Sequence, residues 1–299
     1  MILIKIQGGL GNQMFQYALA KKIGLLKKVP VKFDISWFNN FGEKTAPRHY
    51  NLPKFNIIEN IATDKEIKKF QRHYPHFSKI GKFYNFLFSD SSKYFKEKNR
   101  NFDSSILNLN DNVCLDGFWQ SEKYFKNIEN IIRTEFTLKE ESENFIKLKE
   151  NILKRKNSSI AIHVRRGDYI RDPQKKERHT VLPTEYYTKS LEIIKEKIPN
   201  PYFFIFPDDI EWCKQYFNKL DNVYFVDDKN LKDYEELITM SKCKHQIIAN
   251  SSFSWWGAWL NPNLNKIVIA PKNYFNNPKI KVNINDRFPR KWIKVYVNF

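Results

Sequence analysis

The sequence predicts an α/β protein with two domains, each a doubly wound parallel sheet flanked by helices. Short apolar runs rich in β-branched and aromatic residues recur along the chain, and segments of helical periodicity separate the later runs. Strands that alternate with helices are typical of parallel βαβ units. At 299 residues the chain is long enough for two domains of ordinary size. The clearest expected strands span residues 2–6, 160–164, 202–206, 223–226, 246–249 and 267–270.

Two helices can be placed between the later strands. Apolar residues from Tyr187 to Ile198 recur at helical spacing and predict a helix that begins near Thr184. Asp233 and Glu236 form the pattern of a capping box, which predicts the start of another helix.

One segment of the chain indicates a domain boundary. The lysine-rich stretch 150–159 separates a helical pattern from a strand. We therefore expect an N-terminal domain over residues 1–155 and a C-terminal domain over 156–299. Residues 57–110 are polar and aromatic without clean periodicity, so they carry no assigned elements.

Composition excludes several classes of protein. Hydrophobic residues make up 41% of the chain and charged residues 28%, which excludes a disordered chain. No run of 18 apolar residues occurs, so no membrane-spanning helix is expected. The three cysteines lie far apart without a C-x-x-C pair, which argues against a disulfide scaffold or zinc ribbon and suits a reducing compartment.

The charge balance points to anionic partners. With 51 basic and 33 acidic residues, the net charge is +18. Such an excess favours nucleic acid, an anionic membrane surface or a phosphorylated small molecule, and the charge alone does not choose among them.

A glycine-rich turn follows the first expected strand. Gly8, Gly9 and Gly11 lie between that strand and a helix with an apolar face, a geometry that presents backbone N–H groups to a ligand. The turn lacks both the G-x-G-x-x-G and the P-loop patterns, so the polar residues Asn12 and Gln13 fit a hydroxyl-rich ligand better than a nucleotide phosphate. The alternative is a tight turn without a ligand.

The expected strand 160–164 ends in the run His163-Val-Arg-Arg-Gly-Asp168. Ligands bind at the carboxyl edge of open α/β sheets, so we expect one arginine to grip a phosphate there. The other would pair with Asp168 or face solvent. The alternatives are a surface ion pair for the arginines and a core position for His163.

Two further segments follow strands in the same way. Asp208 or Asp209 either caps a helix or accepts hydrogen bonds from a base edge such as that of guanine. Asn250, Ser251 and Ser252 can cap a helix, and their side chains and backbone N–H groups would form an anion cradle at its positive end. Ordinary capping with aromatic core packing is the alternative. Together with an arginine, such a helix start predicts a diphosphate site.

Metal chemistry is not expected from this sequence. There is no D-x-D pair, and among six histidines only His73 and His76 lie close together, without a cysteine nearby. We expect no metal and no resident cofactor.

These four segments resemble the α-1,2-fucosyltransferase family, and their order and spacing match along nearly the whole chain. The segments are 8–18, 163–168, 207–212 and 250–258. The His-x-Arg-Arg element is shared with α-1,6- and protein O-fucosyltransferases. The resemblance implies a GT-B fold of two Rossmann-like domains with a cleft between them. It also implies inverting, metal-independent transfer from GDP-fucose, bound mainly by the second domain, to the 2-hydroxyl of a terminal galactoside.

The resemblance also implies roles for individual residues. Arg165 would hold the β-phosphate of the leaving GDP, and His163 would lie near ribose or guanine. Asp208 or Asp209 would contact guanine, and residues 250–253 would cradle the diphosphate. Candidates for a catalytic base are Asp168, His163 and a residue of the first domain. Pro207 departs from the family, in which serine is common at this turn.

The first residues of the chain and the net charge give expectations about location and partners. The chain begins at its first strand, whereas animal members of the family carry a membrane anchor before it, so a bacterial, cytoplasmic enzyme is expected. The basic excess predicts peripheral contact with an anionic membrane, where a lipid-linked oligosaccharide would be the acceptor. Two alternatives remain: a glycosyltransferase that uses another nucleotide sugar, and a basic nucleic-acid-binding protein, for which no recognition motif is present.

Overall fold

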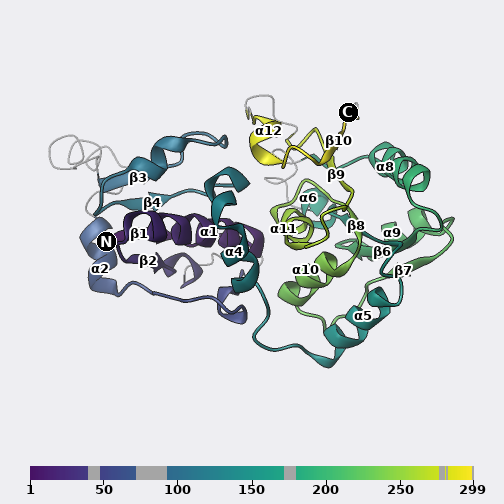
Figure 1. The fold of residues 1–299 in the computed structure, drawn as a ribbon, viewed down its shortest axis with the longest axis horizontal. Helices are drawn as coiled ribbons and strands as arrows, with labels where there is room; N and C mark the ends of the chain where they lie inside the picture. The colour runs from purple at the N-terminus through teal and green to yellow at the C-terminus, as the bar shows by residue number, and fades with distance from the viewer. Residues whose placement is uncertain (40–47, 72–92, 172–179, 276–279, 281, 298–299) are drawn as a thin grey trace. The chain divides into compact units, whose positions relative to one another are not determined.

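The computed structural model describes residues 1–39, 48–71, 93–171, 180–275, 280 and 282–297. The chain forms two compact units, Met1–Phe136 and Thr137–Phe299, which are described separately (Figure 1). This division precedes the boundary expected after residue 155, because the helix before that boundary packs against the second unit. Helix α5 (Glu143–Leu153) contacts α10 (Asp233–Lys242), and the backbone N–H before α5 donates to the Glu235 carboxylate at 3.0 Å.

The first unit is built on a parallel sheet of four strands in the order β2-β1-β4-β3. The expected first strand is present as β1, and the other three are short strands that the hydrophobic pattern did not single out. The helices of this unit include α2, which lies in the stretch 57–110 left unassigned above. The bounds are β1 (Ile2–Lys5), α1 (Leu10–Lys27), β2 (Val31–Asp34), α2 (Asp64–Gln71), β3 (Tyr94–Lys96), β4 (Cys114–Asp116) and α4 (Glu129–Glu135).

The second unit is built on a parallel sheet of six strands in the order β10-β9-β8-β5-β6-β7. The five strands and two helices expected in this unit are all present, with ends within a few residues of the prediction, and β10 is a sixth strand that was not predicted. The elements after α5 are β5 (Ser159–Val164), α6 (Gly167–Arg171), α8 (Thr184–Lys197), β6 (Tyr202–Pro207), α9 (Ile210–Phe217), β7 (Val223–Phe225), α10, β8 (His245–Ile247), α11 (Ser252–Leu260), β9 (Val268–Pro271), α12 (Ile284–Arg287) and β10 (Ile293–Val295).

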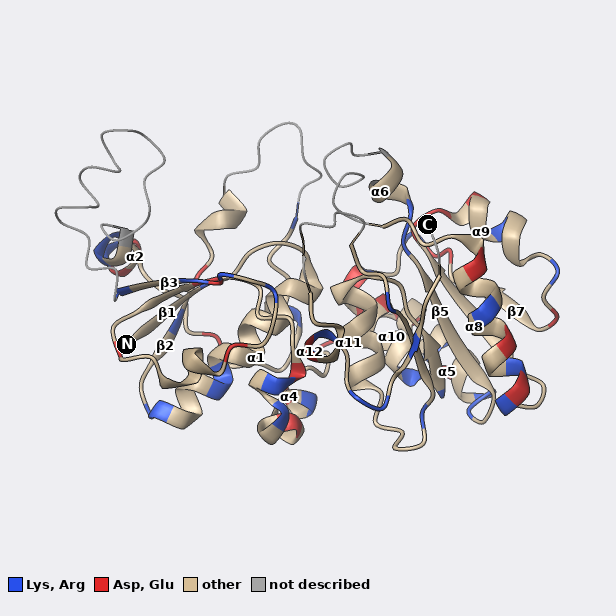
Figure 2. Cartoon of the chain, turned by 90° about the horizontal axis from the view of Figure 1, so that it is seen from above, with Lys and Arg blue, Asp and Glu red and all other residues tan. Residues whose placement is uncertain are grey.

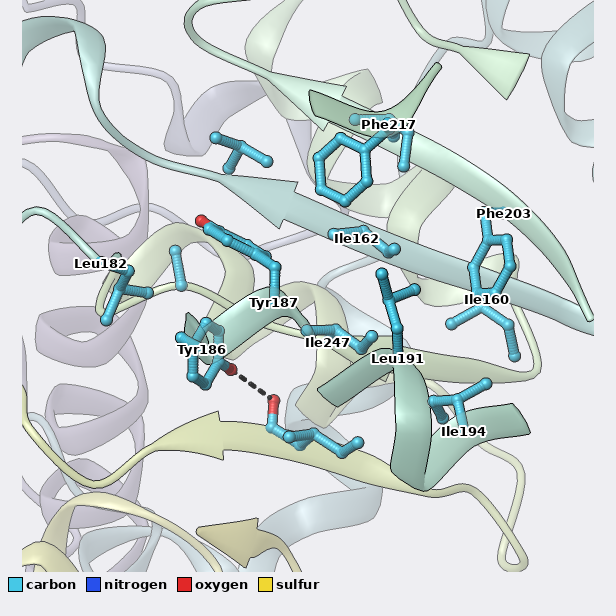
Figure 3. Packing of buried hydrophobic residues seen from close by; sticks show 14 of the residues in the cluster. Ile160, Ile162, Leu182, Tyr186, Tyr187, Leu191, Ile194, Phe203, Phe217 and Ile247 are labelled. Atoms are coloured by element: carbon cyan, nitrogen blue, oxygen red, sulfur yellow. Dashed lines mark hydrogen bonds between the residues drawn. The ribbon is translucent and has the colours of Figure 1, made fainter. Parts of the chain in front are cut away.

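Strand β5 is buried on both faces, which explains why its sequence is largely apolar without alternation. Ile160 and Ile162 face a core formed with α8, whereas Ala161 faces a second core formed with α5 and α10. Figure 3 shows the first of these cores around Tyr186, with its hydroxyl near the backbone carbonyl of Ile269, 3.3 Å away. The same hydroxyl donates to the backbone carbonyl of Ile248 at 2.6 Å. The central strand is therefore fixed from both sides, and so is the point at which its carboxyl end leaves the sheet.

Two features of the surface bear on partners. Lysines and arginines are distributed over both units (Figure 2). Within the described residues, no helix is long and apolar enough to cross a membrane.

Candidate functional site

The second sheet has a topological switch point between β5 and β8. From β5 the chain continues to β6 and β7 on one side, and the later strands β8, β9 and β10 lie on the other side. In open α/β sheets, ligands bind at the carboxyl ends of the strands that flank such a point. The expected segments after β5, β6 and β8 all leave from this edge. The sheet therefore brings together three of the four segments that the sequence singled out.

Asp208 fastens the ends of β5 and β6 to each other. Its Oδ1 accepts the backbone N–H groups of Arg166 at 2.7 Å and Gly167 at 3.1 Å. Its Oδ2 lies 3.5 Å from Nε of Arg165. One carboxylate thus fixes the path of the chain after β5 and holds a guanidinium at the ligand edge of the sheet.

The two adjacent arginines make different contacts, as expected for neighbours that leave a strand. The Arg166 guanidinium lies over the Trp212 ring, with its carbon 4.3 Å from the ring centroid, and its Nε lies 3.6 Å from Asp209. Arg165 instead lies near the Tyr169 ring, at 5.6 Å. Arg166 is therefore attached to α9, and Arg165 is the arginine at the switch point. The side chain of Asp168, the other expected partner, lies outside the described residues.

Asp209 caps helix α9, since its carboxylate accepts the backbone N–H of Trp212 at 3.2 Å. This is the capping role that the sequence offered as the alternative to contact with guanine. Asp208 and Asp209 thus both have partners within the protein. Contact between either of them and a base stays a prediction.

The start of α11 lies next to this edge. Ser251 is the N-cap residue, and its hydroxyl accepts the backbone N–H of Phe253 at 3.3 Å. Ser251, Ser252 and Phe253 are each partly exposed, so they have surface available to a ligand. The positive end of the helix dipole adds to the charge of the arginine.

Asn250 was expected to contact a ligand in the anion cradle, but it lies inside the protein. Its side chain is fully buried, and its amide nitrogen donates to the carbonyls of Thr180 at 2.7 Å and Tyr274 at 3.1 Å. Its own carbonyl accepts the Tyr169 hydroxyl at 3.2 Å. Asn250 therefore holds three loops together behind the helix start. Because its side chain is buried, only Ser251, Ser252 and Phe253 of the expected anion cradle have surface available to a ligand.

His163 is also a core residue rather than an exposed one. It is 4% exposed, and its ring centroid lies 5.7 Å from that of Phe253. This burial fits the core alternative and gives the histidine a part in supporting the start of α11.

Glu236 is a functional candidate that the sequence analysis missed. The capping box of α10 is formed by Glu235, whose carboxylate accepts the backbone N–H of Lys232 at 3.1 Å, one residue before the predicted one. Glu236 therefore has no part in the capping box. Its partly buried carboxyl makes no hydrogen bond or ion pair with the described residues. Burial and the charge of Asp233 raise the pKa of Glu236 to about 8, and the nearby Arg165 opposes that shift. The sequence pattern predicted only that Glu236 lies near the start of a helix, and it gave no sign of its burial or of its charged neighbours.

In the first unit, the glycine turn is shaped by a polar side chain. Gly8 has φ of 82°, and a Cβ atom there would lie 2.7 Å from Nδ2 of Asn12. Asn12 also accepts a hydrogen bond from the Gln120 amide, across the switch point between β1 and β4. Gly9 faces Arg48, whose Nη1 would lie 4.0 Å from an added Cβ. The partly exposed Asn12 remains a candidate for ligand contact.

Gln13 does not face a ligand, which corrects the expectation for this residue. Its side chain is fully buried, and its amide nitrogen donates to the carbonyls of Gly8 at 3.0 Å and His49 at 2.9 Å. Its amide oxygen accepts the backbone N–H of Asn51 at 3.0 Å. All of these groups belong to the backbone, so Gln13 joins the glycine turn to the segment after residue 47.

A second polar cluster at the carboxyl edge of this sheet was not predicted. Asp116 lies at the end of β4 and accepts hydrogen bonds from Lys5 at 3.1 Å, Gln7 at 3.0 Å and the Tyr94 hydroxyl. These bonds keep the pKa of Asp116 below its ordinary value even though burial opposes ionisation. The strand before it is only three residues long, which is too short for a clear pattern in the sequence.

In the part of the chain that the structure describes, no group of three or more His, Cys, Asp or Glu side chains is placed to hold a metal ion. The groups that converge at the switch point are instead an arginine, a helix start and backbone N–H groups. Such an arrangement suits an anionic ligand.

Comparison with known sequences gives matches over nearly the whole chain. The model of Glycosyl transferase family 11 matches residues 1–296. An α-1,2-colitosyltransferase of Escherichia coli is 32% identical over 306 residues, which cover 98% of each chain. The O-antigen biosynthesis glycosyltransferase WbnK of Escherichia coli is 30% identical and covers 94% of this chain and 97% of its own. Galactoside α-(1,2)-fucosyltransferase 1 of Lagothrix lagotricha is 26% identical over 49% of this chain and 42% of its own.

Solved structures give the same class of fold. FUT1 of Arabidopsis thaliana, determined as a mutant in complex with GDP, has a TM-score of 0.52 at 11% identity and covers 93% of this chain and 72% of its own. The fucosyltransferase NodZ from Bradyrhizobium has a TM-score of 0.50 at 17% identity, with 87% and 92% covered. These likenesses confirm the predicted GT-B class, with two Rossmann-like units. The protein is a glycosyltransferase, and its chain belongs to glycosyltransferase family 11.

Proposed function

We propose that the protein transfers L-fucose from GDP-fucose to the 2-hydroxyl of a terminal galactoside, with inversion at the anomeric carbon. The observation that carries the proposal is the position of Arg165 at the switch point, directly after β5, the strand that pairs with the one that leads into α11. An α-1,2-transferase as a relative across 98% of the chain supports the linkage.

The proposed chemistry needs positive charge at the leaving diphosphate. When the bond between sugar and phosphate breaks, negative charge develops on the β-phosphate and the sugar becomes oxocarbenium-like. Arg165 and the N–H groups at the start of α11 would meet that charge without a metal. Because Asp208 already holds the backbone next to Arg165, these donors are in place before the reaction and need little rearrangement.

We assign the recognition of guanine to Glu236, in place of the expected Asp208 or Asp209. Both aspartates are engaged within the protein, whereas the Glu236 carboxyl lacks a hydrogen-bond partner among the described residues and lies close enough to Arg165 for their charges to interact. Guanine offers two adjacent donors, N1–H and the exocyclic amine, which match a carboxylate. Its binding would favour the ionised carboxyl, so GDP binding at pH 7 should release a proton.

Calorimetry of GDP binding in two buffers of different ionisation enthalpy tests this assignment. Proton release that disappears in Glu236→Gln, together with weaker binding of GDP, supports it. Unchanged GDP affinity in a folded Glu236→Gln protein contradicts the assignment of guanine to this residue, and it leaves the transfer reaction itself untouched.

Colitosyl transfer is a second candidate, because the relative with 32% identity over 98% of both chains is a colitosyltransferase. Colitose is fucose without its 3-hydroxyl, so one site can accept either sugar unless a protein group bonds that hydroxyl. A site that bonds the hydroxyl would reject colitose strongly, whereas an apolar site would discriminate weakly. The ratio of kcat/KM for the two GDP-sugars decides between the candidates.

A transfer assay with a panel of donors and acceptors tests the function. GDP-fucose, GDP-colitose, GDP-mannose and UDP-galactose would be offered with lactose and other galactosides, and the linkage would be determined by NMR. An α-1,2-linked fucosyl product with GDP-fucose preferred supports the proposal. Transfer only from a UDP-sugar, or a shift of nucleic acid in a gel at physiological salt without any transfer, would overturn it.

A further inference from the structure

The C-terminal half of α1 carries exposed leucines between lysines. Leu25 is 47% exposed and Leu26 is 50% exposed, although the earlier part of the same helix is buried almost throughout. Lys22 lies three and four residues before these leucines, which places all three on one side of the helix. Lys28 follows Leu25 by three residues and is exposed as well. We call Lys22, Leu25, Leu26 and Lys28 the α1 face.

The charge of this helix has one sign. Helix α1 contains no Asp or Glu, and its lysines are among the blue segments of Figure 2. Lys21 is partly neutralised by an ion pair with Glu135 of α4, whereas no ion pair of Lys22 or Lys28 is present among the described residues. The α1 face therefore combines apolar surface with uncompensated positive charge.

Packing against the described residues of the first unit leaves about half of each leucine exposed. The position just before them is closely packed, because a Cβ atom added at Gly24 would lie 3.3 Å from the Val31 side chain. The two leucines are therefore apolar surface at the end of a helix that is otherwise well packed. Isolated exposed leucines are ordinary, but adjacent ones on a helix flanked by lysines match the pattern of helices that lie in a membrane interface.

We propose that the α1 face binds the surface of an anionic lipid bilayer. The lysines would be attracted by the negative headgroups, and the two leucines would enter the boundary between headgroups and acyl chains. The glycine turn lies at the other end of this 18-residue helix, roughly 27 Å away at about 1.5 Å per residue, so bilayer contact would leave the ligand edge of the first unit open.

Co-sedimentation with vesicles tests the proposal. The wild-type protein should bind vesicles that contain phosphatidylglycerol and should bind pure phosphatidylcholine vesicles much less, and the binding should fall as salt rises. Leu25→Gln with Leu26→Gln keeps the charge but should weaken binding roughly fivefold or more, because the apolar anchor is lost. Lys22→Gln with Lys28→Gln should weaken it roughly tenfold at low salt.

A matched control separates this surface from general charge attraction. Lys195→Gln with Lys197→Gln removes two exposed lysines from α8 and should leave binding close to wild type. Thermal melting would verify that each variant is folded. Equal loss in the control and in the lysine variant, or full binding by the leucine variant, would overturn the proposal. So would self-association of the wild type in solution that the leucine variant abolishes without any vesicle binding, because the face would then join two copies of the chain.

Discussion

Arg166 and Trp212 form a stacked pair in which the guanidinium carbon lies 4.3 Å from the centre of the indole ring. The pair holds Arg166 against α9, away from the switch point. Of the two neighbouring arginines that follow β5, it is therefore Arg165 that remains at the switch point, with its guanidinium beside Asp208.

Arg165→Ala should lower kcat by about 10²–10³, the scale for loss of a preorganised donor to developing charge. The side chain is only partly buried, at 24% exposure, so the fold should survive. Arg165→Lys should recover little, because an ammonium cannot make the two-pronged contact of a guanidinium. Steady-state kinetics with GDP-fucose on the purified variants would measure this.

Arg166→Ala is the matched control for Arg165→Ala. It should affect thermal stability more than kcat, since it breaks the contacts with Trp212 and Asp209. If a folded Arg165→Ala protein kept the wild-type kcat while Arg166→Ala lost it, the assignment of the two arginines would be reversed.

Glu236 should make stability depend on pH. In the folded protein its pKa is about 8, whereas an unfolded chain has a glutamate pKa of about 4.3. Between these values the folded protein holds a proton that the unfolded chain has released, so the stability contributed by the neutral carboxyl is full at low pH and is lost as pH rises through about 8. Glu236→Gln should remove this pH dependence. The melting temperature of the variant minus that of the wild type should therefore increase from pH 5 to pH 9. Glu192→Gln, on the exposed side of α8, should gain nothing.

Gln13 and Asn12 should separate stability from activity. Gln13→Ala removes the partner of two partly buried carbonyls and one N–H, which should cost about 3 kcal/mol of folding free energy and lower the melting temperature by about 10 °C. Asn12→Ala should cost about 1 kcal/mol, because its side chain is partly exposed. It should nevertheless reduce transfer more than Gln13→Ala does per folded molecule. The reverse order of activities would mean that the glycine turn has no contact with a ligand.

Transfer should be independent of metal ions. The switch point offers an arginine and a helix start for the diphosphate, and the sequence lacks a D-x-D pair. Fucose transfer should therefore survive an excess of EDTA. Activity that chelation abolishes and Mg²⁺ or Mn²⁺ restores would contradict this.

Periodicity in the sequence was enough to predict which segments meet at the carboxyl edge of the second sheet. Strands β5, β6 and β8 are buried on both faces, and apolar residues predominate in the predicted strands that correspond to them. The polar segments that follow these strands therefore had to meet at the carboxyl edge of the sheet. The direction of each side chain was not predictable in this way. Gln13 and Asn250 have the residue types of a ligand site, yet their partners are backbone groups far away in the sequence.

Glu236 shows the complementary limit of sequence reasoning. Its candidacy depends on burial, on the charge of Asp233 in the same helix, and on the charges of Arg165 after β5 and Asp208 after β6. The burial and the two distant charges are not visible in the local pattern, which predicted only a capping box of Asp233 and Glu236. The three-residue strands β3 and β4 were missed for a related reason, since so short a segment has no measurable period.

Because of the two hydrogen bonds that the Asn250 amide donates, this position should not tolerate a side chain of the same shape that carries a negative charge. Both partners are carbonyl oxygens, so only a donor is tolerated between them. An aspartate has the same outline, but it would set its own oxygens against theirs in a place that water does not reach. Asn250→Asp, which replaces a single nitrogen by oxygen, would thus separate the loops at Thr180 and Tyr274. The same exchange at an exposed asparagine would have little effect on the fold.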